Sequence, residues 1–354
     1  MANKVSVIGS GNWGTTIARM VGTNCAEKSS LFEKKVNMWV FEEKIQVDGK
    51  EYKLTEYINQ HHENVKYLPG TKLPDNVVAV PDVKDAIAGS NILIFVLPHQ
   101  FVKGTCESIK DLVRKDAFAI SLCKGFEVTE NDLIMISDVV KNTLNISCGA
   151  LMGANLANEI AMEQFAEATI ATKDESQGRI FQQVFNRPFF RCAWVDDVTA
   201  VECCGALKNI IALGAGFVDA LGMGNNTKCA IIRLGLMEMM AFAEEFYGCK
   251  NRSVFFESCG IADLVTTSYG GRHTKLGKLF VTTGKSFEEL EKEHLNGQKL
   301  QGHQTAEKVY KMLEAKGPAD VEKYPLFAAI HRVSQRQMKA DQIFECLQNH
   351  PEHM

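Results

Sequence analysis

The eleven cysteines of this 354-residue chain lack the spacings that metal sites and disulfide frameworks require. No two of them stand in a C-x-x-C arrangement, and the adjacent Cys203 and Cys204 suit neither a common zinc site nor a small disulfide-stabilised fold. His61 and His62 are also adjacent, but a metal site needs more ligands than they supply. We therefore expect no bound metal, and reduced thiols as in the cytosol.

The chain also lacks a strong charge of either sign. Its formal net charge is −4, which gives no electrostatic reason to expect nucleic acid or an anionic membrane as a partner. Arg233 and Glu238 interrupt the apolar stretch that comes closest to a membrane span. Residues 1–4 lead directly into an apolar run, which leaves no room for a leader. These features predict a cytoplasmic protein without membrane insertion.

Short apolar runs in the first half of the chain predict the strands of a parallel sheet. Several contain no polar residue, as is typical of strands covered on both faces. Helical patterns lie between many of them, so an α/β fold with a Rossmann-like, doubly wound sheet follows. The predicted strands are residues 5–8, 36–40, 77–80, 92–97, 117–122 and 150–152.

The pattern changes from mixed to helical near residues 194–197. Beyond this point apolar residues recur with helical spacing, and no segment has a convincing strand pattern. We therefore predict a Rossmann-like N-terminal domain at residues 1–194 and an all-helical C-terminal domain at residues 195–354. The predicted helices are residues 197–221 and 228–246 and the segments around Leu264, Leu290 and Val309.

A glycine-rich turn, Gly9-Ser10-Gly11-Asn12-Trp13-Gly14, stands between the first predicted strand and a helical run. In this setting Gly9 permits the tight turn, Gly11 lets the backbone approach a pyrophosphate, and Gly14 lets the helix pack closely on the strand. The N-terminus of the helix then offers free N–H groups to the phosphates. The turn predicts a dinucleotide site.

NAD fits this site better than NADP. The second predicted strand is followed by Glu42 and Glu43, whose carboxylates can accept hydrogen bonds from a ribose 2′-hydroxyl and would repel a 2′-phosphate. Phe41 is either a platform for the adenine ring or a core residue. Three further predicted strands are followed by polar groups that include His99, Lys124 and Asn155, at the edge where such sheets bind ligands.

The candidate for acid–base chemistry is Lys208, in an apolar helical stretch where a surface lysine is not expected. Burial disfavours the ammonium ion and would bring its pKa towards a working range. Asp263 and Thr267 are four residues apart, so on a helix they share a face, and Lys208 is the obvious partner for the aspartate. The glycine pair before Arg272 predicts a phosphate anchor.

These residues carry a family likeness. The chain resembles the eukaryotic cytosolic NAD-dependent glycerol-3-phosphate dehydrogenases over essentially its whole length. The motifs that carry the resemblance are residues 9–14, 39–43, 98–101, 151–155, 205–209, 257–260, 269–272, 296–302 and 348–354.

The resemblance implies reversible reduction of dihydroxyacetone phosphate to sn-glycerol 3-phosphate with NADH, by a homodimer. It implies that Lys208 is the acid–base residue and that Lys124, Asn209, Asp263, Thr267 and Arg272 surround the substrate. The resemblance further implies cofactor contacts from Phe41, Phe101, Ala157, Arg272, Lys299 and Gln301, in addition to the turn at residues 9–14.

One position departs from the family pattern. The family usually has asparagine after the arginine of the Gly-Gly-Arg motif, where it helps to hold the substrate phosphate, and here the residue is His273. A histidine can also donate to phosphate, with a strength that depends on pH near neutrality. We expect weaker phosphate binding above pH 7.

Two other functions remain open from the sequence. A dehydrogenase of the 3-hydroxyacid or 6-phosphogluconate type shares the architecture and a lysine–asparagine pair on a helix, but a plain hydroxyacid does not explain Arg272 and Lys124 together. A silent NAD(H)-sensing protein is disfavoured by the intact set of Lys208, Asp263 and Arg272.

Overall fold

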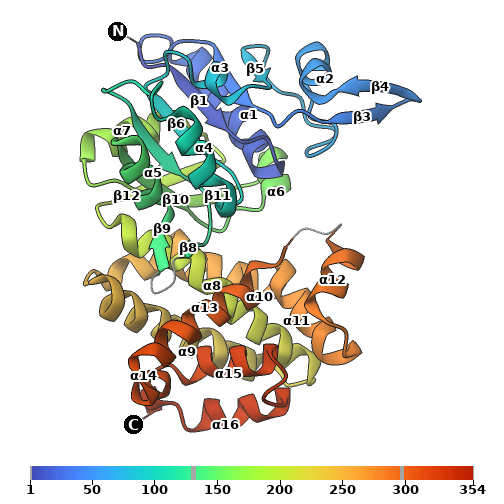
Figure 1. The fold of residues 1–354 in the computed structure, drawn as a ribbon, viewed down its shortest axis with the longest axis vertical. Coiled ribbons are helices and arrows are strands. Elements are labelled where there is room, and N and C mark those ends of the chain that lie inside the picture. The colour runs from blue at the N-terminus through green and yellow to red at the C-terminus, as the bar shows by residue number, and fades with distance from the viewer. Residues whose placement is uncertain (1, 129–132, 296–298, 354) are drawn as a thin grey trace. The chain divides into compact units, whose positions relative to one another are not determined.

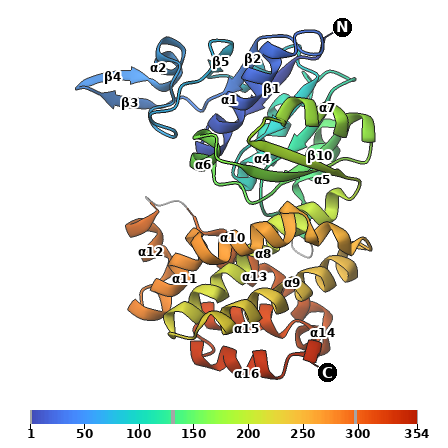
Figure 2. The ribbon, with the colours of Figure 1, turned by 180° about the vertical axis from the view of Figure 1, so that it is seen from behind.

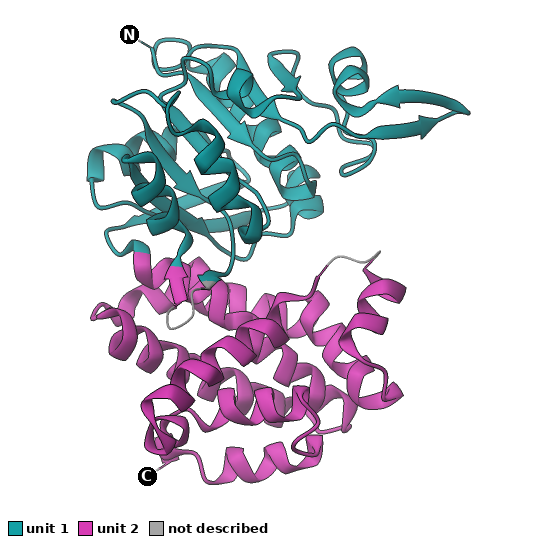
Figure 3. Ribbon diagram, viewed as in Figure 1, with its two compact units in different colours: residues 1–127, 135–198 teal, residues 128–134, 199–354 magenta. Residues whose placement is uncertain are grey.

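The computed structural model describes residues 2–128, 133–295 and 299–353. The chain forms two compact units, shown in separate colours in Figure 3. The first contains residues 1–127 and 135–198, and the second contains residues 128–134 and 199–354. The sequence analysis did not anticipate that the short segment 128–134 belongs to the second unit. Tyr247 contributes to this placement by donating its hydroxyl hydrogen to the carbonyl oxygen of Leu133 at 2.8 Å.

An eight-stranded sheet forms the centre of the first unit, in the order β12-β11-β10-β7-β6-β1-β2-β5. Its neighbours are parallel except for the antiparallel pair β10 and β11. The strands are β1 (Val5–Ile8), β2 (Val36–Trp39), β5 (Val77–Val80), β6 (Ile92–Phe95), β7 (Phe118–Ser121), β10 (Ser147–Met152), β11 (Ala166–Ala171) and β12 (Phe190–Val195).

Helices cover both faces of this sheet, as the sequence predicted (Figures 1 and 2). α1 packs with α6 and α7, whereas α4 packs with α3 and α5. β1, β6 and β7 are therefore buried along their whole length, which explains why their residues are apolar apart from the buried Ser6 and Ser121. The helices are α1 (Asn12–Glu27), α2 (Leu54–His61), α3 (Val83–Ile87), η1 (His99–Phe101), α4 (Val102–Ile109), α5 (Ile136–Leu144), α6 (Ala157–Ala161) and α7 (Glu175–Phe185).

The order of the strands creates a switch point between β1 and β6. The chain runs from β1 to β2 and β5 on one side, then returns to place β6 and β7 on the other side of β1. Ligands of open α/β sheets bind at the carboxyl ends of the strands at such a point. The glycine-rich turn follows β1 and therefore lies where the fold predicts a ligand.

The second unit is helical apart from its share of a small two-stranded sheet, β8 (Phe126–Val128) and β9 (Leu133–Met135), as far as the described residues show. Helices α8 and α9 are its longest (Figure 1). Its helices are α8 (Val198–Ala220), α9 (Asn225–Tyr247), η2 (Arg252–Phe256), η3 (Ser258–Ala262), α10 (Asp263–Gly270), α11 (Arg272–Thr283), α12 (Phe287–His294), α13 (Gln301–Lys316), α14 (Pro318–Lys323), α15 (Pro325–Ser334), η4 (Ala340–Gln342), α16 (Ile343–Gln348) and η5 (Pro351–His353).

Helix α8 corrects one expectation from the sequence. By length and composition it is apolar enough to cross a membrane, contrary to our prediction that no such stretch exists. Its most apolar window is entirely buried inside the protein, as in the core helix of a globular fold. The stretch that Arg233 and Glu238 interrupt belongs to α9. The prediction rested on that stretch and did not take α8 into account.

Candidate active site

The glycine-rich turn has the geometry predicted for a dinucleotide site. Gly9 adopts φ +122°, and a methyl group there would lie 2.3 Å from the carbonyl oxygen of Val96. A methyl group at Gly14 would lie 2.3 Å from the carbonyl oxygen of Gly9, so α1 packs directly on the turn. Nothing lies within 4 Å of the corresponding position at Gly11. The backbone at Gly11 is therefore open to a ligand, while Gly9 and Gly14 are closely packed.

Two asparagines support the turn: Asn64, which the sequence analysis did not identify, and Asn12, which lies in the turn itself. The fully buried Asn64 donates to the carbonyl oxygen of Ser10 and to the hydroxyl of Thr15, both at 2.9 Å. Asn12 donates to the carbonyl oxygen of Tyr67 and to Asn158, both at 2.8 Å. The polar sequence around Asn64 gave no sign of this role, because its partners lie about 50 residues away along the chain.

The start of α1 is open to an anion, and two further predicted residues lie beside it. No side chain caps the helix at Gly11, so its first N–H groups remain for a phosphate. The carbonyl oxygen of Ala157 accepts a hydrogen bond from Thr16 at 3.3 Å, which places Ala157 next to the first turns of α1. Trp13 packs on Phe190, with ring centroids 6.2 Å apart, so its side chain serves the core.

Polar groups gather at the carboxyl edge of the sheet, as predicted. Lys124 follows β7 and donates to the carbonyl oxygen of Gly153, after β10, at 3.4 Å. A methyl group at Gly125 would lie 2.9 Å from Nδ1 of His99, after β6. Because β10, β7 and β6 are adjacent, these groups form one continuous part of the edge. Asn155 instead turns to the backbone, donating to the carbonyl oxygen of Glu167 at 2.9 Å.

The aromatic residues predicted to contact the cofactor are exposed. Phe41 is 71% exposed and Phe101 is 58% exposed, so Phe41 is not the core residue that the sequence left open. The two acidic residues after β2, in contrast, already have partners. Glu42 accepts hydrogen bonds from the backbone and hydroxyl of Thr55, and Glu43 accepts one from the Tyr67 hydroxyl at 2.6 Å. If these carboxylates bind the ribose hydroxyls, they must do so while they also accept hydrogen bonds from Thr55 and Tyr67.

In the second unit, Lys208 lies at the centre of a buried polar cluster. It is 4% exposed, and its ammonium donates to Oδ1 of Asp263 at 2.5 Å and to the hydroxyl of Thr267 at 2.7 Å. Asp263 is 2% exposed. The pairing expected from the sequence is therefore present. Burial opposes the charge on Lys208, whereas the carboxylate and the hydroxyl stabilise it.

The local fold aims Asp263 and Thr267 at the lysine. Both lie on one face of α10, one turn apart, while Val265 and Tyr269 are exposed. A π-helical turn, η3, leads directly into Asp263. Such turns are frequent at functional sites. Thr274, on α11, donates to the carbonyl oxygen of Thr267 at 2.8 Å and thereby ties α11 to α10.

Arg272 and His273 begin α11, next to this cluster in the chain. Arg272 retains exposed surface, yet the atoms packed around it lower the pKa of its guanidinium through loss of water, which does not remove its charge at neutral pH. His273 is buried. A methyl group at Gly302 would lie 2.7 Å from Cδ2 of His273 and 2.7 Å from the carbonyl oxygen of Asn209. His273, Asn209 and the start of α13 therefore meet beside Lys208.

Lys299 and Gln301, the last two predicted residues, lead into this contact. Gln301 is the first residue of α13, directly before Gly302. Lys299 donates a hydrogen bond to Glu291 at 3.0 Å. Glu291 is a buried residue of α12 that the sequence analysis missed. Its position offered a signal, because Glu291 falls on the apolar face of α12 with Phe287 and Leu290. Residues 296–298, which belong to the family motif at 296–302, lie outside the described part of the chain.

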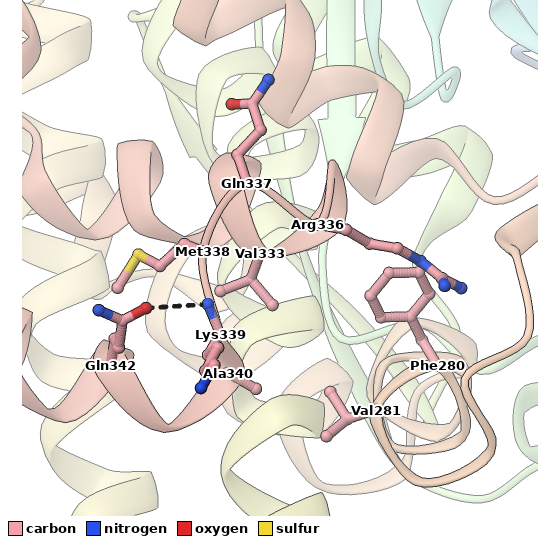
Figure 4. Close-up of a pocket in the computed structure, with 9 residues that line it drawn as sticks. All are labelled: Phe280, Val281, Val333, Arg336, Gln337, Met338, Lys339, Ala340 and Gln342. Atoms are coloured by element: carbon pink, nitrogen blue, oxygen red, sulfur yellow. Dashed lines mark hydrogen bonds between the residues drawn. The ribbon is translucent and has the colours of Figure 1, made fainter.

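Two cavities of the second unit lie apart from these residues. One of about 540 Å³ is lined by Arg336 and Lys339 among apolar and amide side chains, with Arg336 lying over the Phe280 ring (Figure 4). The other, of about 470 Å³, is lined by residues of α13 to α16 that include Tyr310 and Cys346. None of the predicted site residues lines either cavity.

Comparison with known proteins bears on both units. The family model described as NAD-dependent glycerol-3-phosphate dehydrogenase N-terminus matches residues 4–178, and the one described as its C-terminus matches residues 197–345. The cytoplasmic NAD-dependent glycerol-3-phosphate dehydrogenase of Drosophila melanogaster is 54% identical over 100% of this chain and 96% of its own length.

Solved structures agree with this result. The glycerol-3-phosphate dehydrogenase of Saccharomyces cerevisiae superposes with a TM-score of 0.91 at 42% identity, covering 99% of this chain and 100% of that one. The corresponding protein of Dunaliella salina has a TM-score of 0.90 at 42% identity, and the match covers 97% of this chain but 60% of that longer chain. This chain belongs to the family of NAD-dependent glycerol-3-phosphate dehydrogenases.

Proposed function

We propose that the chain reversibly reduces dihydroxyacetone phosphate to sn-glycerol 3-phosphate with NADH, and that Lys208 is its acid–base residue. The observation that carries the proposal is the buried contact of Lys208 with Asp263 and Thr267. A lysine held without access to bulk water, with its ammonium fixed by two acceptors, is suited to proton transfer. Family membership supplies the substrate and the cofactor.

Lys208 carries the proton step. NADH, when bound, supplies the hydride that adds to the ketone carbon. The ammonium of Lys208 stabilises the negative charge that develops on the ketone oxygen and donates a proton to it. Asp263 and Thr267 hold the ammonium in place, since each accepts one of its hydrogens. In the oxidative direction the neutral amine takes the hydroxyl proton.

The substrate phosphate and hydroxyl groups need further partners. Arg272 provides a planar cation suited to phosphate, and His273 lies next to it at the start of α11. Asn209 and Lys124 are the proposed partners of the substrate oxygens. Binding energy from the phosphate, which does not react, then orients the ketone for the transfer.

The first unit fits NAD. The open backbone at Gly11, the uncapped start of α1 and the exposed ring of Phe41 match a pyrophosphate and an adenine. Phe101, Ala157, Arg272, Lys299 and Gln301 are the remaining proposed contacts. We assign cofactor binding mainly to residues 1–194 and substrate chemistry to residues 195–354.

We further propose a cytoplasmic homodimer. The cytoplasm is the location in the names of the related enzymes. The exposed apolar residues Phe256 on η2 and Val265 and Tyr269 on α10 offer surface for a second copy. Light scattering coupled to size-exclusion chromatography tests the assembly, and a mass of about 39.3 kDa at micromolar concentration would contradict it.

Loss of NADH absorbance with dihydroxyacetone phosphate tests the activity. Unphosphorylated dihydroxyacetone and NADPH serve as controls for the phosphate and for the cofactor. We expect oxidation only when dihydroxyacetone phosphate and NADH are both present. Folded protein that binds NADH but stays silent with this substrate would contradict the proposal and favour a hydroxyacid dehydrogenase or an NAD(H) sensor.

A further inference from the structure

Helix α12 carries a carboxylate in a position that normally holds an apolar side chain. Glu291 is 2% exposed and lies on the same face of α12 as Phe287 and Leu290, which are also buried. A glutamate is almost never fully buried unless it has partners that compensate for the loss of water. Its partners therefore show what the residue does.

Both oxygens of Glu291 bind the segment that precedes α13. Oε1 accepts a hydrogen bond from the backbone N–H of Leu300 at 2.8 Å, and Oε2 accepts one from the ammonium of Lys299 at 3.0 Å. The side chain of Lys299 is still 58% exposed. The carboxylate thus fixes the course of the backbone and the place of a cation that remains accessible to a ligand.

The fixed segment continues directly into the site around Lys208. Gly302, two residues after Leu300, packs so closely on Asn209 and His273 that a methyl group would lie 2.7 Å from each. A shift of Leu300 would therefore move Gln301 and Gly302 against the residue that follows Lys208. The geometry connects Glu291 to the site through the backbone as well as through Lys299.

Helix α12 is itself held rigidly, so Glu291 has a defined place. The Phe287 ring lies parallel between two others, 4.3 Å from the Phe280 ring on α11 and 4.5 Å from the His303 ring on α13. Arg336 covers the outer face of Phe280 at 5.3 Å (Figure 4). Glu291 follows Phe287 by one helical turn and on the same face, so this stack sets its position.

We propose that Glu291 is a positioning residue that holds Lys299 and the backbone at Leu300 in place to bind the phosphate groups of NADH. The inference rests on the proposed function, in which Lys299 contacts the cofactor. Glu291 does not touch the ligand. It orients a flexible lysine before binding, so less conformational freedom is lost when the phosphates arrive.

Glu291→Gln tests this role. The amide oxygen of glutamine still accepts the Leu300 N–H, but the charge that holds Lys299 is lost. We expect the dissociation constant and the KM for NADH to rise roughly tenfold, the order expected when a charge-assisted hydrogen bond is lost. The kcat at saturating NADH and the KM for dihydroxyacetone phosphate should stay near wild type. Glu291→Asp, which keeps the charge, should recover part of the NADH affinity.

The matched control is Glu293→Gln on the same helix. Glu293 is exposed and pairs with Lys285 on the surface at 2.7 Å, so its loss should leave NADH binding unchanged. Lys299→Met should weaken NADH binding at least as much as Glu291→Gln, because it removes the cation itself, and adding Glu291→Gln to it should cause no further loss. The double variant also removes the buried Glu291 charge that Lys299→Met alone leaves without its cation.

Several results would overturn the proposal. NADH affinity that is unchanged or tighter in Glu291→Gln would mean that the carboxylate has no role in binding or competes with the phosphates for Lys299. A lower melting temperature with both KM values unchanged would reduce Glu291 to a structural residue. A rise in the KM for dihydroxyacetone phosphate alone would assign Lys299 to the substrate. NADH binding measured by fluorescence needs no turnover, so it separates these outcomes from failure of the proposed activity.

Discussion

Lys208 carries an ammonium group inside the protein, where the residue is only 4% exposed to solvent. Desolvation of this charge is offset by Asp263 and Thr267 at 2.5 and 2.7 Å. Lys228, in the same unit, is also buried and pairs with the partly exposed Asp219 at 2.7 Å, so burial and pairing of a lysine alone do not identify the catalytic residue. What distinguishes Lys208 is its neighbourhood of Asn209, His273 and Gly302, and the chemistry of its family.

His273 is the residue at which this chain departs from its family. A protonated ring donates to phosphate and adds a positive charge, whereas a neutral ring only donates, so phosphate binding should weaken when a rise in pH removes the proton. His273→Asn should flatten the dependence of the apparent KM for dihydroxyacetone phosphate on pH. Titration of the substrate phosphate affects both proteins equally, so the difference between the two profiles reports the histidine. Identical profiles would refute this role.

Sequence reasoning at this scale identified residues whose environment conflicts with their chemistry. Lys208 in an apolar helix and Asp263 among apolar neighbours were found in this way, and the structure brings them together. Asn64 was not found, because an asparagine in a polar stretch carries no such conflict and its contact with Ser10 spans the fold. Glu291 carried the conflict, but the surrounding charges of α12 concealed it.

At the scale of elements, the packing of the start of α13 requires a glycine at position 302. The requirement is for space and not for a left-handed backbone conformation. A methyl group at Gly302 would press on the backbone of Asn209, which cannot yield as a flexible side chain can. Gly302→Ala should cost about 1 to 3 kcal/mol of stability and reduce kcat, because the strain reaches the residue after Lys208. Gly104→Ala is the control, since nothing lies within 4 Å and alanine favours the α4 helix. Equal melting temperatures and rates for both variants would contradict this packing.

Helix α15 makes the fold sensitive to acid. Burial lowers the pKa of His331, and the nearby Lys311 and Arg332 act in the same direction, while Glu307 and Glu314 oppose them. The unfolded chain therefore takes up the proton at a higher pH, and stability is lost as the pH falls through about 6.5.

His331→Phe tests this sensitivity, because it retains the stacking on Tyr310, whose ring lies 4.3 Å away, and removes the titration. The melting temperature should fall less between about pH 7.5 and about pH 5.5 in this variant than in the wild type. His61→Phe, at an exposed ring stacked on Tyr57, should change nothing. A larger acid effect in His331→Phe would reverse the sign of the argument.

Helices and strands could be predicted where the apolar residues follow one clear pattern, either a continuous run or a helical repeat. β1, inside the sheet, and β5, at one of its edges, were predicted to the residue, and α8 and α9 within a few residues. β12, at the other edge of the sheet, and its neighbour β11 were missed, because partial exposure leaves them without a continuous apolar run. The hairpin of β3 (Lys44–Val47) and β4 (Lys50–Lys53) was also missed, although Asp48-Gly49, with φ of 52° and 76°, is a strong signal for a two-residue turn.

At the scale of the whole molecule, one chain supplies two kinds of site. The sheet of the first unit presents an open backbone and exposed rings at its carboxyl edge, while the helical unit holds buried charges. The sequence predicted the fold of each part from periodicity. It did not predict that segment 128–134 joins the second unit, because a short strand pair has no pattern that reveals its partner.

The kinetics of Lys208→Ala test the central claim most directly, with NADH affinity measured on the same protein. We predict that kcat falls by about 10² to 10⁴ while the dissociation constant of NADH stays nearly unchanged, because the proton donor is lost and the glycine-rich turn is intact. Lys228→Ala, which breaks the pair between the buried Lys228 and Asp219, should retain its kcat. If the unpaired Asp263 prevents folding, Lys208→Ala with Asp263→Asn removes that charge. A folded Lys208→Ala protein that turns over near the wild-type rate would contradict the account.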